Sequence, residues 1–163
     1  MINKKRKNED LNKYLLSNKE FKIYIALEKK LAPHIRLLNY LFENKKIKYS
    51  IMIIKATEKS IQETTSYIRK TDIFLKIPYT SNHYLLLLQN TDSKAAIQFG
   101  SRLTSLINRT FLINKKTISH KVSLIAFEKT PPTLVNLTYE ILLLIKKFKE
   151  KNGEEHWVEI KRF

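Results

Sequence analysis

The sequence has no cysteine and only two glycines among its 163 residues. The absence of cysteine excludes disulfide bonds, thiolate metal sites and a cysteine nucleophile, and it fits a reducing compartment. Gly100 and Gly153 alone cannot build a phosphate-binding glycine loop or a dinucleotide fingerprint. The apolar runs are far shorter than the ~20 residues that span a bilayer, and no signal-peptide core follows the basic N-terminus. We therefore expect a soluble, cytoplasmic protein with no membrane span.

Acidic residues are scarce relative to basic ones, because 15 Asp and Glu oppose 31 Lys and Arg and leave a net charge of +16. Such a field attracts polyanions such as nucleic acid, anionic lipid or nucleotides. The lysines are spread along the whole chain, whereas a nucleic-acid site would concentrate arginine and aromatic residues on one face. The charge thus has two interpretations: a compositional bias, or a basic nucleic-acid-binding protein.

The first 46 residues are expected to be helical. Apolar residues recur at helical spacing over residues 9–30, with a break near Ser17 and Asn18 as an alternative to one helix. Pro33 suits the first turn of a second helix that reaches about residue 44. We therefore expect an N-terminal helical appendage over residues 1–46, followed by a domain over residues 47–163.

From residue 47 onward, the pattern predicts the order strand, helix, strand, strand, helix, strand, helix, strand. The expected strands are 48–55, 73–77, 83–88, 118–127 and 156–160, and the expected helices are 57–69, 92–110 and 133–151. This order predicts an α+β fold with a ferredoxin-like or palm-like βαββαβ core and an antiparallel central sheet. The last helix and strand are extra C-terminal elements.

The order and spacing of several short motifs resemble the GGDEF (diguanylate cyclase) family. Residues 67–72 (YIRKTD) are followed by a hairpin, four leucines and then residues 90–96 (NTDSKAA). The family has there an arginine, two residues, an aspartate, a strand, the GGDEF turn, an apolar strand and a turn into an alanine-rich helix. Residues 122–126 (VSLIA) and 134–153 look like its later strand and last helix. The resemblance covers about residues 49–160.

The resemblance also implies where catalytic carboxylates would lie, and the sequence departs from the family at those positions. The first strand of the family ends in a carboxylate, where this chain has Lys55. The GGDEF turn, which holds another, aligns with Thr80, Ser81, Asn82, His83 and Tyr84. An ammonium group and an imidazole cannot replace the oxygen ligands that Mg²⁺ needs. We therefore predict no catalytic residues, no cofactor and no enzymatic activity.

A metal site of another kind is not expected either. The four histidines, His34, His83, His120 and His156, are far apart in the sequence. They lack the paired spacing that zinc sites use. The sequence therefore predicts no metal ligands.

One ligand site of the family has matching residues. Many members bind cyclic di-GMP through an arginine-x-x-aspartate before the GGDEF turn and a second arginine on the next helix. Arg69 and Asp72 match the first part, and Arg102 matches the second. Guanidinium groups suit guanine edges and phosphates. The pattern is short, however, and Arg69 with Asp72 fits a surface ion pair at a helix end equally well.

The resemblance thus implies a catalytically inactive GGDEF-like module that acts as a protein-interaction or signalling scaffold, with cyclic di-GMP as a candidate ligand. Family members often dimerise through helices that precede this domain. The apolar residues of the N-terminal helices lead us to expect a protein partner or a homodimer there. The alternative from another class is a basic nucleic-acid-binding protein on a palm-like fold.

Overall fold

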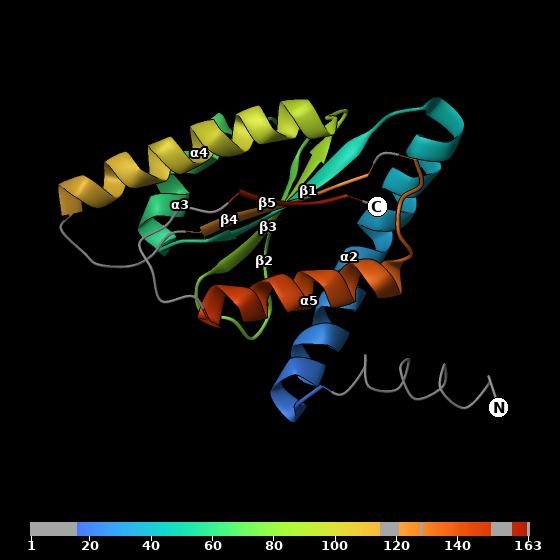
Figure 1. Cartoon of the computed structure of the whole chain (residues 1–163), viewed down its shortest axis with the longest axis horizontal. Coiled ribbons are helices and arrows are strands. Elements are labelled where there is room, and N and C mark those ends of the chain that lie inside the picture. The colour runs from blue at the N-terminus through green and yellow to red at the C-terminus, as the bar shows by residue number, and fades with distance from the viewer. Residues whose placement is uncertain (1–15, 115–120, 128, 151–157, 163) are drawn as a thin grey trace.

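The structure is a computed structural model that describes residues 16–114, 121–127, 129–150 and 158–162 (Figure 1). Five strands form one sheet in the order β2-β3-β1-β4-β5. The strands are β1 (Tyr49–Lys55), β2 (Ile73–Lys76), β3 (His83–Gln89), β4 (Lys121–Ala126) and β5 (Val158–Arg162). The helices are α2 (Asn18–Lys45), α3 (Glu58–Thr64), the short 3₁₀ helix η1 (Thr65–Tyr67), α4 (Ser93–Asn114) and α5 (Leu134–Glu150).

The topology confirms the predicted α+β class. Strands β1 to β4 pair antiparallel, with β1 between β3 and β4. Helix α3 links β1 to β2, and α4 links β3 to β4, so that two split βαβ units interlock as in a ferredoxin-like core. Helix α5 then leads to β5, which pairs parallel with β4 at the edge of the sheet. The parallel edge is an addition to the antiparallel sheet that the sequence predicts.

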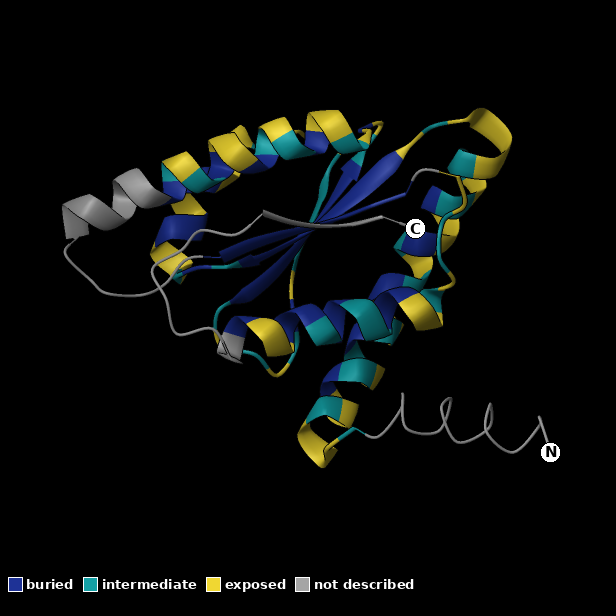
Figure 2. Ribbon diagram, in the orientation of Figure 1, coloured by how far each residue is buried: buried dark blue, intermediate teal, exposed yellow. Residues whose placement is uncertain are grey.

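The sheet is the middle layer of three, with helices on both faces (Figures 1 and 2). Alternate side chains of β1 point to opposite faces, since Ile51 and Ile53 pack toward α2 and α5, and Met52 and Ile54 pack toward α3 and α4. Both central strands, β1 and β3, are therefore buried on both sides. This explains their nearly continuous apolar sequences, which a one-sided sheet would interrupt with polar residues.

Helix α2 is one element, so the prediction of two helices separated near Pro33 is wrong. Pro33 lies inside the helix, where it removes one backbone donor. Burial on both sides of Pro33 outweighs that cost, because Leu27, Leu31, Ile35 and Leu38 are all buried in the core. The expected helical residues 9–15 lie outside the described part of the chain.

The start of α2 is fixed by a capping box. The Ser17 side chain accepts a hydrogen bond from the Glu20 backbone amide, and the Glu20 carboxylate accepts one from the Ser17 amide at 2.8 Å. The same carboxylate forms an ion pair with Lys146 of α5, with Nζ and Oε1 2.9 Å apart. One side chain therefore both caps α2 and ties it to its neighbouring helix.

Helix α4 approaches the sheet closely at Gly100. A Cβ atom at this position would lie 3.2 Å from Cε of Met52 on β1. None of the helices in the described ranges is long and apolar enough to cross a membrane.

Candidate functional site

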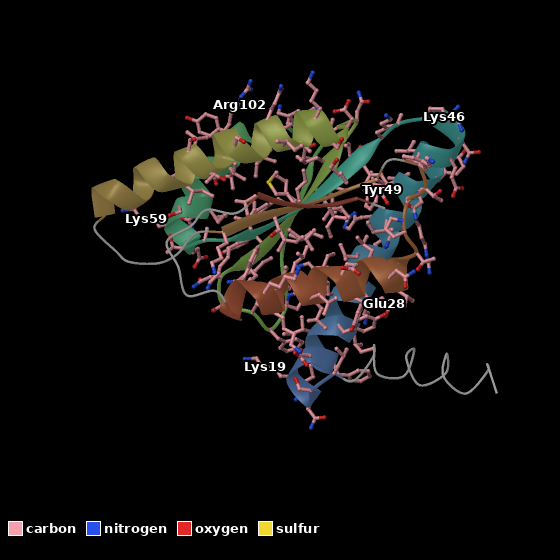
Figure 3. All side chains as sticks on the ribbon, in the orientation of Figure 1. Lys19, Glu28, Lys46, Tyr49, Lys59 and Arg102 are labelled. Carbon is pink, nitrogen blue, oxygen red and sulfur yellow. The ribbon has the colours of Figure 1, made fainter. Side chains whose placement is uncertain are left out.

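A pocket of about 750 Å³ lies between η1, the end of β3 and α4. Apolar side chains form much of its wall: Tyr67, Leu88, Ala95, Phe99, Leu103 and Leu106. Polar side chains complete it: Arg69, Asn90, Thr91, Ser101, Arg102 and Ser105. Figure 3 shows Arg102 on α4, on the side of the molecule opposite α2 and α5. The fold thus brings two of the three predicted ligand residues, Arg69 and Arg102, to one pocket.

Arg69 is held by four hydrogen bonds. Its Nε donates to Asp72 Oδ2 at 3.1 Å, and its Nη2 donates to Asp72 Oδ1 at 2.9 Å. Nη2 also lies 2.8 Å from the Gln89 carbonyl oxygen and 2.6 Å from Thr91 Oγ1. These bonds fasten the segment after η1 to the end of β3. A guanidinium held in this way presents its charge to the pocket in a fixed position.

Asp72 has a structural role that differs from the predicted ligand contact. Its side chain is only 1% exposed, and it does not line the pocket. Oδ1 also accepts a hydrogen bond from the Gln89 amide at 3.2 Å. Both carboxylate oxygens therefore bind groups of the protein, and Asp72 acts on the pocket by orienting Arg69.

The turn after β3 forms the polar side of the pocket. Asn90 adopts a left-handed conformation with φ of 47°, which asparagine tolerates better than most residues. Thr91 is buried; its amide donates to the Lys48 carbonyl oxygen at 3.1 Å, and its own carbonyl accepts from Ser50 Oγ at 3.0 Å. The turn is thereby fixed to β1 and to the residue that precedes it. A ligand would meet a preformed wall.

Arg102 differs from Arg69, which is itself half-exposed, because no hydrogen bond to a described residue fixes its guanidinium. The residue is exposed, and it has no hydrogen bond or ion pair with any described residue. It lies on the same helix as Phe99 and Leu103, which line the apolar wall. One fixed and one free guanidinium beside apolar surface can hold an anionic group and an attached ring.

The positions aligned with the GGDEF turn form the connection from β2 into β3. Thr80 Oγ1 donates to the Ile77 carbonyl oxygen at 2.7 Å, and the Asn82 carbonyl oxygen accepts from the Ala56 amide at 3.0 Å. Ser81 is exposed in this loop. The loop is therefore held by its own backbone contacts and by the end of β1.

His83 and Tyr84 are the first residues of β3, and both are buried. The His83 ring stacks on Phe148 of α5 with centroids 6.1 Å apart, and the Tyr84 ring stacks on Phe74 of β2 at 5.5 Å. Burial, with a smaller contribution from the Glu58 charge, raises the pKa of the Tyr84 hydroxyl. These two rings fill the core on opposite faces of the sheet.

Lys55, His83 and Lys121 form a row across three strands. Lys55 is the cross-strand partner of both His83 and Lys121. Lys121 is buried, and its Nζ donates to the carbonyl oxygen of Phe148 near the end of α5 at 3.1 Å. The C-terminal end of a helix favours cations, so the end of α5 is a favourable position for the lysines of this row. No group of three or more His, Asp or Glu residues in the described ranges could hold a metal ion.

The sequence analysis gave no site role to Tyr67, Phe99 or Thr91, although all three line the pocket. Tyr67 and Thr91 lie inside the two motifs that resemble the GGDEF family, close to Arg69 and to the start of α4. Phe99 has the helical spacing of a core residue, and only the packing of α4 shows that it also borders a pocket. No protein-family model, curated protein or solved structure matches this chain.

Proposed function

We propose that this chain is a non-catalytic GGDEF-like module that binds an anionic, ring-containing ligand of the cyclic di-GMP class and acts as a signalling scaffold. The observation that carries the proposal is that Arg69 and Arg102, on different elements, line the same pocket. Their separation in sequence makes this juxtaposition a property of the fold. Tyr67 and Phe99 add aromatic surface on which a base can stack.

The division of labour between the two arginines follows from their contacts. Nε and Nη2 of Arg69 are already bound to Asp72, Gln89 and Thr91, so Nη1 is the group that a ligand would contact. All the N–H groups of the Arg102 guanidinium can donate to a ligand. We therefore assign Arg102 the principal contact with a phosphate or guanine edge, and Arg69 the fixed positive charge beside it.

The absence of catalysis is part of the proposal. Lys55 and His83 are cross-strand partners where cyclases would place metal-binding carboxylates. The side chains of Lys55, His83 and the buried Lys121 offer Mg²⁺ no oxygen ligand. We expect no cyclic di-GMP from GTP and Mg²⁺.

Nucleic-acid binding, the alternative from the sequence, receives less support. Helices cover both faces of the sheet, so the described strands present no open platform on which bases could stack. The net charge of +16 still favours weak, salt-dependent contact with any polyanion.

The decisive measurement is calorimetric titration with cyclic di-GMP at about 0.15 M salt. We expect saturable binding that Arg102→Gln weakens by at least roughly tenfold. Arg102 lacks partners within the described residues, so its substitution should leave the unfolding midpoint in urea unchanged. Lys94→Gln is the matched control, because it removes one exposed cation from the same helix without altering the pocket wall.

Two results would contradict the proposal. The first is the absence of heat and of any thermal shift with cyclic di-GMP. The second is equal weakening by Arg102→Gln and Lys94→Gln, which would reduce the binding to general charge attraction. Arg69→Ala should lower both binding and stability, so it is informative only beside its unfolding curve.

A further inference from the structure

The outward side of α2 carries an unusual amount of exposed apolar surface. Four of the seven large hydrophobic side chains exposed among the described residues lie on this helix: Phe21 (55%), Ile25 (48%), Leu37 (51%) and Tyr40 (56%). The opposite side of α2 is already buried against the sheet and α5. Figure 2 shows exposed positions along the whole length of the helix. These residues therefore stabilise nothing within the described fold.

A stripe of cations runs along the same side. Lys22, Lys29 and Arg36 are seven residues apart, which places them nearly above one another on a helix, and all three are exposed. None of them has a hydrogen bond or an ion pair with a described residue. At about 100° per residue, the stripe lies between Phe21 and Ile25 on one side and Leu37 on the other.

We propose that this face of α2 binds an acidic amphipathic helix of another protein. A partner with carboxylates spaced one heptad apart would meet Lys22, Lys29 and Arg36. Apolar residues that flank those carboxylates would cover the exposed apolar side chains of α2. The stripe is roughly 21 Å long at 1.5 Å per residue, so the partner needs about four helical turns.

Charge complementarity favours this partner over a second copy of the chain, a membrane or a nucleic acid. In an antiparallel pair of two copies, Lys29 would face Lys29 and Lys22 would face Arg36, so like charges would oppose each other in a chain of net charge +16. On a membrane, the cations would enter the apolar layer, because they lie between the apolar residues, whereas interfacial helices keep cations on the polar face. A nucleic acid could stack bases on Phe21 and Tyr40 but would leave the aliphatic side chains of Ile25 and Leu37 uncovered.

The interaction surface is separate from the arginine pocket. Helix α2 packs against α5 on one face of the sheet, and the pocket lies with α4 on the other. Loss of one activity would therefore leave the other in place, and the two proposals can fail independently.

The probe is a synthetic, fluorescently labelled helical peptide of about three heptads with glutamate at one position of each heptad and leucine at the flanking positions. Two further peptides replace the glutamates with lysine or the leucines with serine. Anisotropy of each peptide is measured against the full chain at about 0.15 M salt. We expect the Glu/Leu peptide to bind at least roughly tenfold more tightly than either of the others.

Two variants of equal net charge test the location. Lys22→Glu/Lys29→Glu/Arg36→Glu should lose the Glu/Leu peptide and gain the lysine peptide. Lys59→Glu/Lys70→Glu/Lys94→Glu, which reverses three exposed cations on α3, after η1 and on α4, should retain the original preference. Circular dichroism confirms that both variants are folded.

Several results would overturn the proposal. One is that the wild-type chain does not bind the Glu/Leu peptide, and another is that both charge variants lose it equally. A third is binding to phosphatidylserine vesicles or self-association in sedimentation that only the α2 variant abolishes, with no binding to the peptides. Vesicle binding of this kind would assign the face to a membrane, and self-association would assign it to a second copy.

Discussion

At the scale of single residues, Asp72 stabilises the fold but does not itself line the pocket. Its carboxylate accepts hydrogen bonds from Arg69 Nε, Arg69 Nη2 and the Gln89 amide while almost completely buried. Removal of this acceptor leaves a buried amide and a half-exposed guanidinium without their partner. Such groups cost about 1–3 kcal/mol each when unsatisfied and buried.

We therefore predict that Asp72→Ala lowers the free energy of unfolding by about 2 kcal/mol, measured by urea denaturation at neutral pH. Asp72→Asn should retain part of this stability, because the amide oxygen still accepts one hydrogen bond. A loss no larger than a few tenths of a kcal/mol for Asp72→Ala would place Asp72 among ordinary surface ion pairs.

At the scale of elements, α2 depends on Glu20 at its first turn. Hydrogen bonds from Lys146 and from the Ser17 backbone lower the pKa of Glu20 from 4.5 to about 2. The carboxylate therefore binds its proton more weakly in the folded chain than in the unfolded one. Its contribution to stability is fully present above pH 4.5 and is lost as the pH falls toward 2.

The corresponding prediction concerns Glu20→Gln. We expect it to lower the unfolding free energy by about 1 kcal/mol at neutral pH, as the loss of a helix cap does. The difference from wild type should shrink as the pH falls from 4.5 to 2. Urea midpoints at several pH values measure it, and a difference that is constant with pH would contradict the assigned pKa.

At the scale of the whole molecule, the net charge of +16 opposes compaction. At 0.1 M salt, repulsion between exposed charges more than about 10 Å apart is largely screened. The folded state holds its lysines closer together than the unfolded state, so it gains more from this screening.

We predict that the urea midpoint rises as sodium chloride increases from about 0.02 M to about 0.5 M. Guanidinium chloride is unsuitable as the denaturant because it contributes its own screening. A midpoint that falls over this range would indicate that ion pairs outweigh repulsion in the folded chain.

The parts of the fold that were predicted correctly are those in which local pattern and burial agree. Strands β1 and β3 are continuous apolar runs because both of their faces are covered, and α4 keeps a clear helical period. Helix α2 was divided in error because its continuity through Pro33 depends on Leu31 and Ile35, which are buried against residues far away in the sequence. Intrinsic helix propensity does not include such tertiary contacts.

The candidate site was predictable to a similar extent. The sequence motif named Arg69 and Arg102, and the fold places both at the pocket. It could not assign Asp72 its role, because burial of the carboxylate depends on the end of β3 packing over it. The exposed face of α2 was expected only as apolar surface; the cationic stripe between its apolar residues required the helix to be continuous.

One of the only two glycines in the sequence lies on α4, at a point where the helix is close to the sheet. Gly100 faces Met52, and an added methyl group would come within 3.2 Å of the methionine terminus. A side chain at this position would therefore require the end of Met52 to move by a few tenths of an ångström. Phe99, Ser101, Arg102 and Leu103 flank this point of closest approach and all line the pocket. A substitution at Gly100 would therefore disturb the packing next to four residues of the pocket wall.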